Sequence, residues 1–477
     1  MPRRTKIVAT LGPACDDPGV LAEMVAAGVD VVRLNLSHGT ADEHLGRLRQ
    51  VRTAAAEAGR VVAVLADLPG PKVRCGDFGE RGHHLATGTK VRLEPGGGPC
   101  DSAVISVDYP TLGQDLNPGD VVIVGDGTIT LRVETVAGGD VTAVVESGGR
   151  ASGRPGFHLP AARSRLSTPT EEDLRLLATV VGAGVDFVAV SFVRSAADLD
   201  AVRRAALPAS VRLVAKIETA PAVDNLDEIV AAADAVMVAR GDLGIELAPE
   251  DVPHLQKRVI RQCVAAGKPV ITATQMLESM IISPSPTRAE VSDVANAVFD
   301  GTDALMLSGE TAIGADPAGT VATMARIAER AEAGADYEQW AALLAKRERA
   351  AAPAHPTAIT RAITHAAWQA ASDLGAAAIL CSTRSGLTAT AMARYRPTAR
   401  LVGLSADDVT VRALALVWGV TPRLVPPAAK TDEMVWYAVE AAVRAGDARP
   451  GDHVVVLARS PDSPDDSTDV LRLVRVR

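Results

Sequence analysis

Lys216 and Glu218 stand two positions apart, at the end of an apolar run in the middle of the chain. Residues i and i+2 of a β-strand point to the same face, so these side chains can share one site. Asp242 follows the next apolar run, and two carboxylates on neighbouring strands suit an oxygen-ligated Mg²⁺ or Mn²⁺. A lysine beside such a metal can neutralise the charge on a phosphoryl group in transfer. An isolated Lys–Glu pair is more often a structural ion pair, so the interpretation depends on its surroundings.

Polar side chains of this kind follow six of the predicted strands, each just past its apolar residues. In chain order they are Arg33, Asn35, Ser37 and His38; Asp67; Lys216 and Glu218; Arg240 and Asp242; Thr274; and Ser308 and Glu310. Any one of them alone is well explained as a turn or capping residue. Together they favour a site at the C-terminal face of a parallel barrel, where such enzymes hold their catalytic groups. Gly241 and Asp242 also precede a helical pattern, whose backbone N–H groups can approach an anion.

The elements that must position these residues form an alternating α/β pattern. Short runs rich in Val, Ile, Leu and Ala alternate with helical stretches, which is typical of a parallel sheet covered by helices. Strands are predicted near 5–10, 30–34, 61–66, 185–190, 211–217, 235–239, 269–273 and 303–307. These eight strands predict a closed (β/α)₈ TIM barrel. No internal repeat is found.

Two further segments do not fit the barrel pattern. Residues 71–158 contain alternating strand-like runs and Gly-rich turns, which predicts a small all-β lid domain inserted into a βα loop of the barrel. After about residue 340, strand-like runs at 376–381, 401–404 and 454–457 predict a separate open-sheet α/β domain. The expected division is therefore 1–70 with 159–340 for the barrel, 71–158 for the lid and 341–477 for the C-terminal domain.

Composition narrows the classes of function. The net charge of −9 argues against a broad surface for nucleic acid, although it leaves room for a local basic pocket. No apolar stretch approaches the length of a membrane-spanning helix, and the N-terminal residues show no signal-peptide pattern. The five cysteines are scattered, without metal-ligand spacing. We therefore expect a cytoplasmic protein without a membrane or nucleic-acid partner.

With these residues in place, the sequence closely resembles the pyruvate kinases over nearly its whole length. The matching blocks are residues 5–13, 32–39, 215–218, 239–244, 273–280 and 286–311, and the last of these (PTRAEVSDVANAVFDGTDALMLSGET) is highly specific by itself. The resemblance implies transfer of the phosphoryl group of phosphoenolpyruvate to ADP with Mg²⁺ or Mn²⁺. It also implies a homotetramer.

The resemblance assigns roles to individual residues. Glu218 and Asp242 would hold the metal, Lys216 would stabilise the phosphoryl group, and Arg33 and Arg74 would bind its oxygens. The backbone N–H groups of Gly241 and Asp242, with the Thr274 hydroxyl, would hold the substrate carboxylate. A proton would reach the enolate through water near Thr274, Ser308 and Glu310. Pro13, His38 and Arg74 would contact the nucleotide.

The sequence departs from the family pattern where many members bind K⁺. The expected cation ligands match Asn35, Ser37, Asp67 and a Thr, but the Thr position is Leu68, and a nearby Glu position is Lys72. The Lys72 ammonium can supply the charge that K⁺ would supply, so we predict activity without K⁺. The alternative is that Lys72 is a solvated hinge residue and K⁺ still binds.

Two positions outside the barrel also bear on function. Ser382, Thr383, Arg384, Ser385 and Thr388 follow a strand and open a helix, where the family places an effector phosphate. We predict a sugar-phosphate or nucleotide effector there; ordinary helix capping is the alternative. In the lid, a lysine expected before Gly156 is replaced by Pro155, and whether Arg154 takes its role is left open.

Two other functions are compatible with parts of this pattern. An aldolase or lyase of the same barrel class would share a metal site, but not the lid insertion or the C-terminal domain. A non-catalytic homologue would be expected to have lost one of the residues Arg33, Lys216, Glu218, Asp242 or Thr274, all of which are present.

Overall fold

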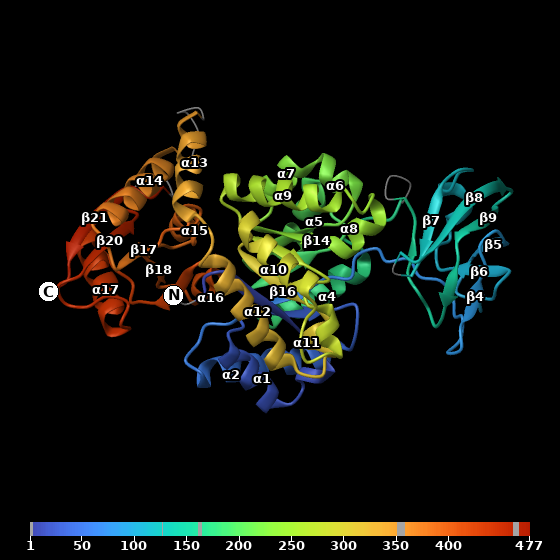
Figure 1. The fold of residues 1–477 in the computed structure, drawn as a ribbon, viewed down its shortest axis with the longest axis horizontal. Coiled ribbons are helices and arrows are strands. Elements are labelled where there is room, and N and C mark those ends of the chain that lie inside the picture. Colours follow the sequence, from blue (N-terminus) through green and yellow to red (C-terminus); the bar gives the residue numbers. More distant parts are fainter. Residues whose placement is uncertain (1–2, 126, 161–164, 351–357, 461–466) are drawn as a thin grey trace.

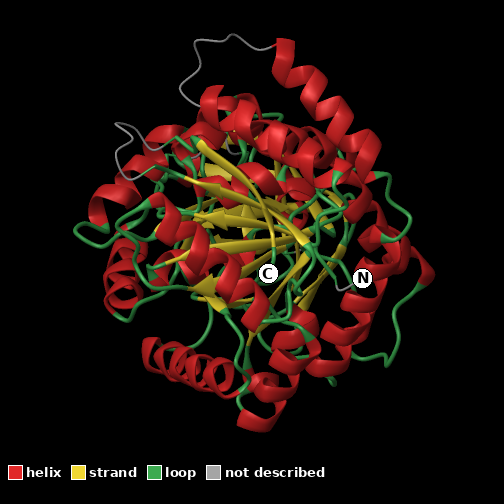
Figure 2. Ribbon diagram, turned by 90° about the vertical axis from the view of Figure 1, so that its left-hand side faces the viewer, coloured by secondary structure: helices red, strands yellow, loops and turns green. Residues whose placement is uncertain are grey.

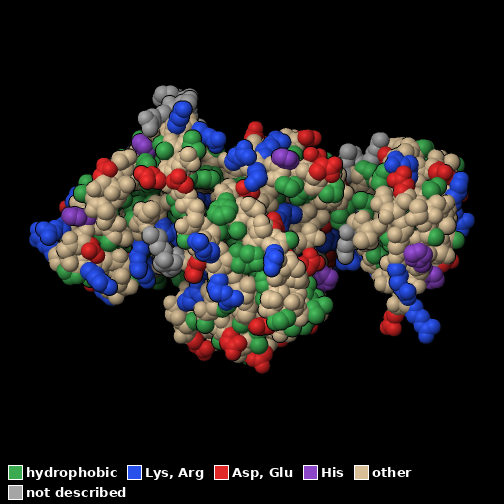
Figure 3. Space-filling view, in the orientation of Figure 1, with side chains coloured by type: hydrophobic (Ala, Val, Ile, Leu, Met, Phe, Trp, Pro, Cys, Tyr) green, Lys and Arg blue, Asp and Glu red, His purple; other side chains and the backbone are tan. Residues whose placement is uncertain are grey.

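A computed structural model describes residues 3–125, 127–160, 165–350, 358–460 and 467–477. The chain forms three parts along its longest axis, with the barrel in the middle, the lid at one end and the C-terminal domain at the other (Figure 1). On the face drawn in Figure 3, acidic and basic side chains are interspersed over all three parts. Among the described residues, no helix has the length and apolar character needed to cross a membrane.

The predicted eight-stranded barrel is confirmed. Its strands are β1 (Lys6–Leu11), β2 (Val31–Asn35), β3 (Ala63–Asp67), β12 (Phe187–Val190), β13 (Arg212–Ile217), β14 (Ala235–Ala239), β15 (Val270–Ala273) and β16 (Ala304–Leu307). All neighbouring pairs are parallel, and β1 pairs with both β2 and β16, which closes the sheet. Figure 2 views the molecule from the side of the C-terminal domain, which lies in front of the barrel.

Helices cover the outside of the barrel between successive strands. They are α1 (Pro18–Ala27), α2 (Ala41–Glu57), α4 (Glu171–Gly182), α5 (Ala196–Ala205), α6 (Ala220–Asp224), α7 (Leu226–Ala232), α9 (Val252–Ala266), α10 (Arg288–Asp300) and α12 (Pro317–Glu332). The short helices α8 (Arg240–Glu246) and α11 (Gly309–Ala312) begin directly where β14 and β16 end. These two therefore sit at the C-terminal face, where the polar residues gather.

Alternate residues of each strand fill two separate cores. Inside the barrel, small and branched side chains such as Val8, Ala63, Val214 and Ala304 pack together, while Ile7, Val64 and Leu213 face the helices. This alternation follows from the two-residue period of a strand. The small interior residues explain how the barrel closes with so few aromatic side chains in the chain.

An aspartate precedes every second barrel strand and ties it to the strand before. Asp30, Asp186, Asp234 and Asp303 each accept a hydrogen bond from a backbone N–H near the start of the preceding strand, at 2.7–3.0 Å. Each aspartate also returns a backbone N–H to the carbonyl of the same partner residue. Each carboxylate pairs with an arginine as well. The base of the barrel is thus built from four two-stranded units, a pattern that the sequence analysis missed because each instance is a single residue.

The lid is a β-structure with its own apolar core. Its strands are β4 (His83–Leu85), β5 (Lys90–Pro95), β6 (Val104–Val107), β7 (Val121–Val124), β8 (Ile129–Ala137), β9 (Asp140–Ser147), β10 (Gly149–Ala151) and β11 (Phe157–His158), with one short helix, α3 (Leu112–Asp115). Six of them form a sheet in the order β11-β7-β8-β9-β5-β6. The lid lies in sequence between β3 and β12, the pair that Asp186 ties together.

The C-terminal part is an open five-stranded sheet. It contains α13 (Tyr337–Ala350), α14 (Ala358–Asp373), β17 (Ala378–Ser382), α15 (Leu387–Ala393), β18 (Arg400–Ser405), α16 (Asp408–Ala413), β19 (Val420–Leu424), α17 (Thr431–Arg444), β20 (His453–Ala458) and β21 (Val470–Arg475). The strand order is β19-β18-β17-β20-β21, with only β21 antiparallel to its neighbour. The three predicted strands are its centre, and the two edge strands were not predicted.

Candidate active site

Lys216 lies near the carboxyl end of β13, within a buried polar cluster. Its Nζ atom donates to the Ser191 hydroxyl at 2.7 Å, and lies 3.3 Å from Asp67 Oδ1 and 2.8 Å from Glu218 Oε1. Asp67 ends β3, and Ser191 directly follows β12, so three adjacent strands deliver the cluster. The sequence arrangement of Lys216 and Glu218 thus produces a shared site.

The charges in this cluster shift one another's pKa values. Burial tends to lower the pKa of Lys216, but the Asp67 and Glu218 carboxylates outweigh it, and the pKa lies above its ordinary value. Burial tends to raise the pKa of Asp67, but Lys216 and Arg33 hold it below its usual range. In Glu218, burial and the charge of Asp242 raise the pKa against the pull of Lys216. The cluster therefore holds a firmly protonated lysine at the mouth of the barrel.

Arg33 and Arg74 are held by different parts of the chain. Arg33 Nε donates to Asp67 Oδ2 at 2.7 Å, and Nη1 donates to Thr10 Oγ1 at 3.1 Å, so its guanidinium is fixed to the barrel. Arg74 lies on the segment that leads into the lid, and its Nη1 donates to the Arg154 carbonyl at 3.4 Å. One arginine thus belongs to the barrel and the other to the lid.

Thr274 and Gly241 meet at the ends of β15 and β14. The Gly241 N–H donates to Thr274 Oγ1 at 2.8 Å, and that hydroxyl donates to the Ala273 carbonyl at 2.7 Å. The Asp242 side chain lines the cavity beside them. In this state the Gly241 N–H and the Thr274 hydroxyl are hydrogen-bonded to each other. A substrate carboxylate that binds here would replace this hydrogen bond.

Ser308 and Glu310 follow β16 and differ in their hydrogen bonding. Glu310 is buried, and its two oxygens accept the backbone N–H groups of Ser308 at 2.6 Å and Leu277 at 3.2 Å. The Glu310 carboxylate therefore links the turn after β15 to the turn after β16 by hydrogen bonds. The Ser308 Oγ atom is buried and has no hydrogen-bond partner among the residues that the structure describes, which leaves it able to bind a water or a substrate atom.

Glu218 and Asp242 fit a divalent metal that also needs ligands from elsewhere. Glu218 Oε2 accepts the Phe192 N–H at 2.8 Å, and its buried Oε1 lies 2.8 Å from the Lys216 ammonium. Asp242 is near enough for its charge to raise the pKa of Glu218. Across the described residues there is no group of three or more His, Cys, Asp or Glu side chains suited to a metal. Two carboxylates, completed by substrate and water, suit Mg²⁺.

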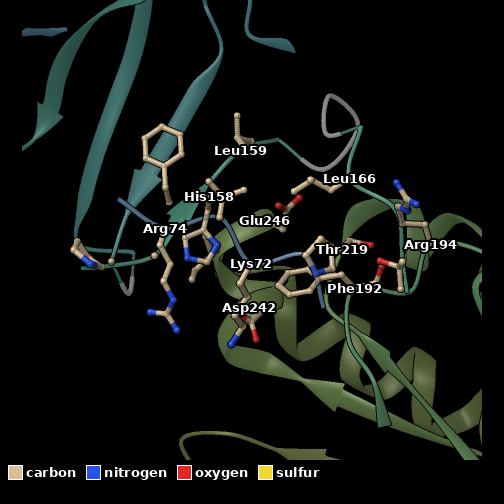
Figure 4. Close-up of a pocket in the computed structure, with 18 of the residues that line it drawn as sticks. Lys72, Arg74, His158, Leu159, Leu166, Phe192, Arg194, Thr219, Asp242 and Glu246 are labelled. Atoms are coloured by element: carbon tan, nitrogen blue, oxygen red, sulfur yellow. The ribbon is translucent and has the colours of Figure 1, made fainter. Parts of the chain in front are cut away.

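A cavity of about 420 Å³ opens between the barrel and the lid (Figure 4). Its lining combines four predicted residues with several others: His38, Lys72, Arg74 and Asp242, together with His158, Phe192, Arg194, Thr219 and Glu246. Burial and the charges of Lys72 and Arg74 lower the pKa of His38. The cavity wall therefore combines the basic side chains of Lys72, Arg74 and Arg194 with the carboxylates of Asp242 and Glu246.

The residues of the predicted monovalent-cation region are already engaged. Both Asp67 oxygens contact cationic groups of the chain, and Asn35 Oδ1 accepts the Ser37 N–H at 3.3 Å. Leu68 is buried in the barrel's outer core. Lys72 is exposed and lines the cavity. Pro13 begins a 3₁₀ turn near the barrel mouth and does not line the cavity.

The lid residue Arg154 faces the lid itself. Its guanidinium lies 3.5 Å from an Asp108 carboxylate oxygen and donates to the Cys75 carbonyl at 3.5 Å. It is not among the residues that line the cavity.

The residues predicted for an effector lie together in a second cavity of about 440 Å³. Ser382, Thr383, Arg384, Ser385 and Thr388 all line it, with the aromatic ring of Tyr437 among the remaining walls. The loop is tied to the barrel because Arg212, the first residue of β13, donates to the Ser385 carbonyl at 2.8 Å.

Sequence reasoning missed three groups at the site. Ser191 and Arg194 follow β12, the one strand after β1 whose polar end was not considered, so the rule used for the other strands would have found them. His158 lies on lid strand β11, where no sequence pattern distinguishes it from a surface residue. The role of Arg240 was also missed, although the residue was noted.

Comparison with known proteins identifies what this geometry resembles. The family model described as pyruvate kinase, barrel domain, matches residues 2–321, and the one described as pyruvate kinase, alpha/beta domain, matches residues 361–474. A pyruvate kinase of Geobacillus stearothermophilus is 41% identical over 99% of this chain and 80% of its own length. Those of Methylorubrum extorquens and Mycobacterium tuberculosis are also 41% identical, over 99% and 100% of this chain and 98% and 99% of their own lengths.

Proposed function

The chain belongs to the pyruvate kinase family, and on that premise we propose that it transfers the phosphoryl group of phosphoenolpyruvate to ADP without requiring K⁺. The observation that carries the proposal is the protonated Lys216 at the barrel mouth, 2.8 Å from Glu218 and 3.3 Å from Asp67. A fixed cation here stabilises charge on a phosphoryl group as it passes between two oxygens.

The substrate would be held from the barrel and from the lid segment. Arg33, fixed by Asp67 and Thr10, would bind phosphoryl oxygens from the barrel, and Arg74, which lines the cavity, would bind them from the lid segment. The N–H groups of Gly241 and Asp242 and the Thr274 hydroxyl bind the carboxylate. His38, whose pKa is lowered by burial and by the charges of Lys72 and Arg74, would contact the nucleotide together with Pro13 and Arg74. These contacts place the phosphoryl group close to Lys216.

Glu218 and Asp242 would hold Mg²⁺ or Mn²⁺, which when bound supplies positive charge to the phosphoryl oxygens. After transfer, the enolate must take a proton at carbon. Thr274 and Ser308 would position the water that delivers it, which the unpartnered Ser308 hydroxyl supports. Glu310 would act by holding both turns, since each of its oxygens already accepts a backbone N–H.

Independence from K⁺ is supported by the state of the residues that would bind it. Asp67 is neutralised by Arg33 and Lys216, Asn35 accepts a hydrogen bond from its own turn, and Leu68 has no side-chain oxygen, while its carbonyl accepts the Ser191 hydroxyl at 2.8 Å. Lys72 lines the same cavity as His38 and Arg74. The Lys72 ammonium would therefore supply the charge that K⁺ supplies in other family members.

The test is pyruvate formation from phosphoenolpyruvate, ADP and Mg²⁺ in tetramethylammonium buffer, with and without KCl. Equal rates support both the kinase and the role of Lys72. Activity only with KCl keeps the kinase but overturns the Lys72 proposal, while no activity in either buffer favours a lyase or a non-catalytic homologue. Lys72→Met should lose activity, and Lys72→Glu combined with Leu68→Thr should make the rate depend on KCl.

The second cavity supports an effector that carries a phosphate. The hydroxyls of Ser382, Thr383, Ser385 and Thr388 and the Arg384 side chain suit a phosphate group, and a sugar phosphate or a nucleotide would bind through it. We expect one of these to lower the KM for phosphoenolpyruvate, and Thr388→Ala to weaken that effect. We also propose a homotetramer, which analytical ultracentrifugation would test.

A further inference from the structure

The turn that carries Thr274 has a strained backbone. Thr274 and Gln275 adopt φ angles of 68° and 55°, in the left-handed region that residues other than glycine rarely occupy. Such conformations persist only where the surrounding structure fixes them, and they concentrate at functional sites. Contacts from neighbouring residues must therefore stabilise the Thr274–Gln275 turn.

Arg240 stabilises the Thr274–Gln275 turn through several contacts made by its guanidinium group. Its Nε donates to the Ala273 carbonyl at 3.2 Å, and its Nη2 donates to the Thr274 carbonyl at 2.6 Å and lies 2.8 Å from Met276 Sδ. Its Nη1 donates to an Asp293 oxygen at 2.8 Å, which anchors the group to α10. The Arg240 side chain is only 11% exposed, so these contacts are made largely away from water.

The same contacts fix the Thr274 hydroxyl relative to its neighbours. Arg240 directly precedes Gly241, whose N–H donates to Thr274 Oγ1. Residues 240–241 thus contact the turn in two ways: the Arg240 side chain donates to the Ala273 and Thr274 carbonyls, and the Gly241 N–H donates to the Thr274 hydroxyl. A planar guanidinium can donate to two carbonyls and a carboxylate at once, whereas an ammonium cannot reproduce that geometry.

We propose that Arg240 is a positioning residue for phosphoenolpyruvate: it keeps the Thr274–Gln275 turn strained, so that the Thr274 hydroxyl stays aligned with the Gly241 and Asp242 N–H groups. Arg240 acts through the turn, without touching the substrate. The inference rests on the proposed function, because its effect is measured on phosphoenolpyruvate.

The test compares Arg240→Met and Arg240→Lys with the matched control Arg203→Met. Arg203 also bridges a backbone carbonyl and an aspartate, at 2.9 and 3.1 Å, but on α5 rather than at the turn. Arg240→Met should lower kcat/KM for phosphoenolpyruvate by about 10²-fold, since misplacing a binding group has effects of that size. The KM for ADP should stay nearly unchanged. The kcat/KM of Arg240→Lys for phosphoenolpyruvate should lie between those of Arg240→Met and the unmodified enzyme, and that of Arg203→Met should equal the unmodified value.

A second variant separates positioning from simple stabilisation. Glycine adopts a positive φ without strain, so adding Gln275→Gly to Arg240→Met should raise the melting temperature of the single variant. If Arg240 positions Thr274, the phosphoenolpyruvate defect persists in this stabler double variant, and free guanidinium at non-denaturing concentration partly rescues Arg240→Met. Recovery of kinetics together with stability would overturn the proposal, as would unchanged phosphoenolpyruvate kinetics in folded Arg240→Met. Inactivity of the unmodified chain would instead count against the proposed function.

Discussion

At the base of the barrel, four aspartates each accept a backbone N–H and pair with an arginine, while at the mouth Asp67 and Glu218 both pair with Lys216. Both ends use buried charge placed at strand ends. The difference is that the base carboxylates tie neighbouring strands together, whereas the mouth carboxylates surround the cation of the proposed site. Removing a charge should therefore have different consequences at the two ends.

The largest effect is expected from Lys216→Met at the mouth. Activity should fall by at least about 10³-fold, because the variant loses the cation that stabilises the phosphoryl group. Steady-state pyruvate formation measures this. Circular dichroism should show a folded protein, and retention of more than a tenth of the activity would contradict the assignment.

The largest effect on stability is expected from Asp186→Ala at the base. Asp186 accepts from the Val64 N–H at 2.7 Å and pairs with Arg52 and Arg412 at 2.8 and 2.6 Å, and its own side chain is only 1% exposed. Removing one partner of a buried ion pair costs about 3–5 kcal/mol. The melting temperature should drop clearly, while kcat at a temperature where the variant is folded stays close to normal. A selective loss of kcat in Asp186→Ala would contradict the expectation that base residues act on stability and mouth residues on activity.

A smaller effect is expected from Asp234→Ala in the same pattern. The Asp234 side chain is 28% exposed and has one arginine partner at 3.1 Å, besides the Leu213 N–H at 2.8 Å. Losing such a hydrogen bond costs about 1 kcal/mol. Calorimetry of the two variants compares their loss of unfolding free energy, which we expect to be larger for Asp186→Ala. A larger loss for Asp234→Ala would contradict burial as the cause of the difference.

The smallest effect is a pH dependence that differs between two of the base aspartates. Burial tends to raise the pKa of Asp30, but Arg3 and Lys6 hold it below its ordinary value, so its stabilisation is present above about pH 3.9 and is lost as the pH falls. Burial raises the pKa of Asp303 despite Arg396, which reverses the sign. Melting temperatures between pH 3 and 6 should fall less steeply with acidification in Asp30→Asn than in the unmodified protein, and more steeply in Asp303→Asn. Parallel curves for the two variants would contradict these assignments.

The barrel could be predicted because buried parallel strands appear as continuous apolar runs, and each predicted strand lies within two residues of the observed one. The edge strands β19 and β21 were missed because Pro422 interrupts one and two arginines interrupt the apolar run of the other. At the site, polar residues after strands could be recognised from the pattern. The Lys216–Ser191 hydrogen bond and the contacts of Arg240 with the Thr274 turn could not, because they depend on the directions of side chains that come from different strands.

The two connections between the lid and the barrel run side by side, since Arg74 pairs with Gly156 in an antiparallel bridge and the Phe157 N–H donates to the Val73 carbonyl at 2.9 Å. The Gly70 N–H also donates to Asp173 in the first turn of α4 at 2.9 Å, which ties the segment after β3 to the helix that follows the lid. At the opposite end of the barrel, Asp186 ties β12 to β3. An insertion bounded in this way can be exchanged between related genes as a unit, since a lid of another length leaves the register of every barrel strand unchanged. The lid is thus the part of this enzyme in which recombination can alter access to the cavity without a new barrel having to fold.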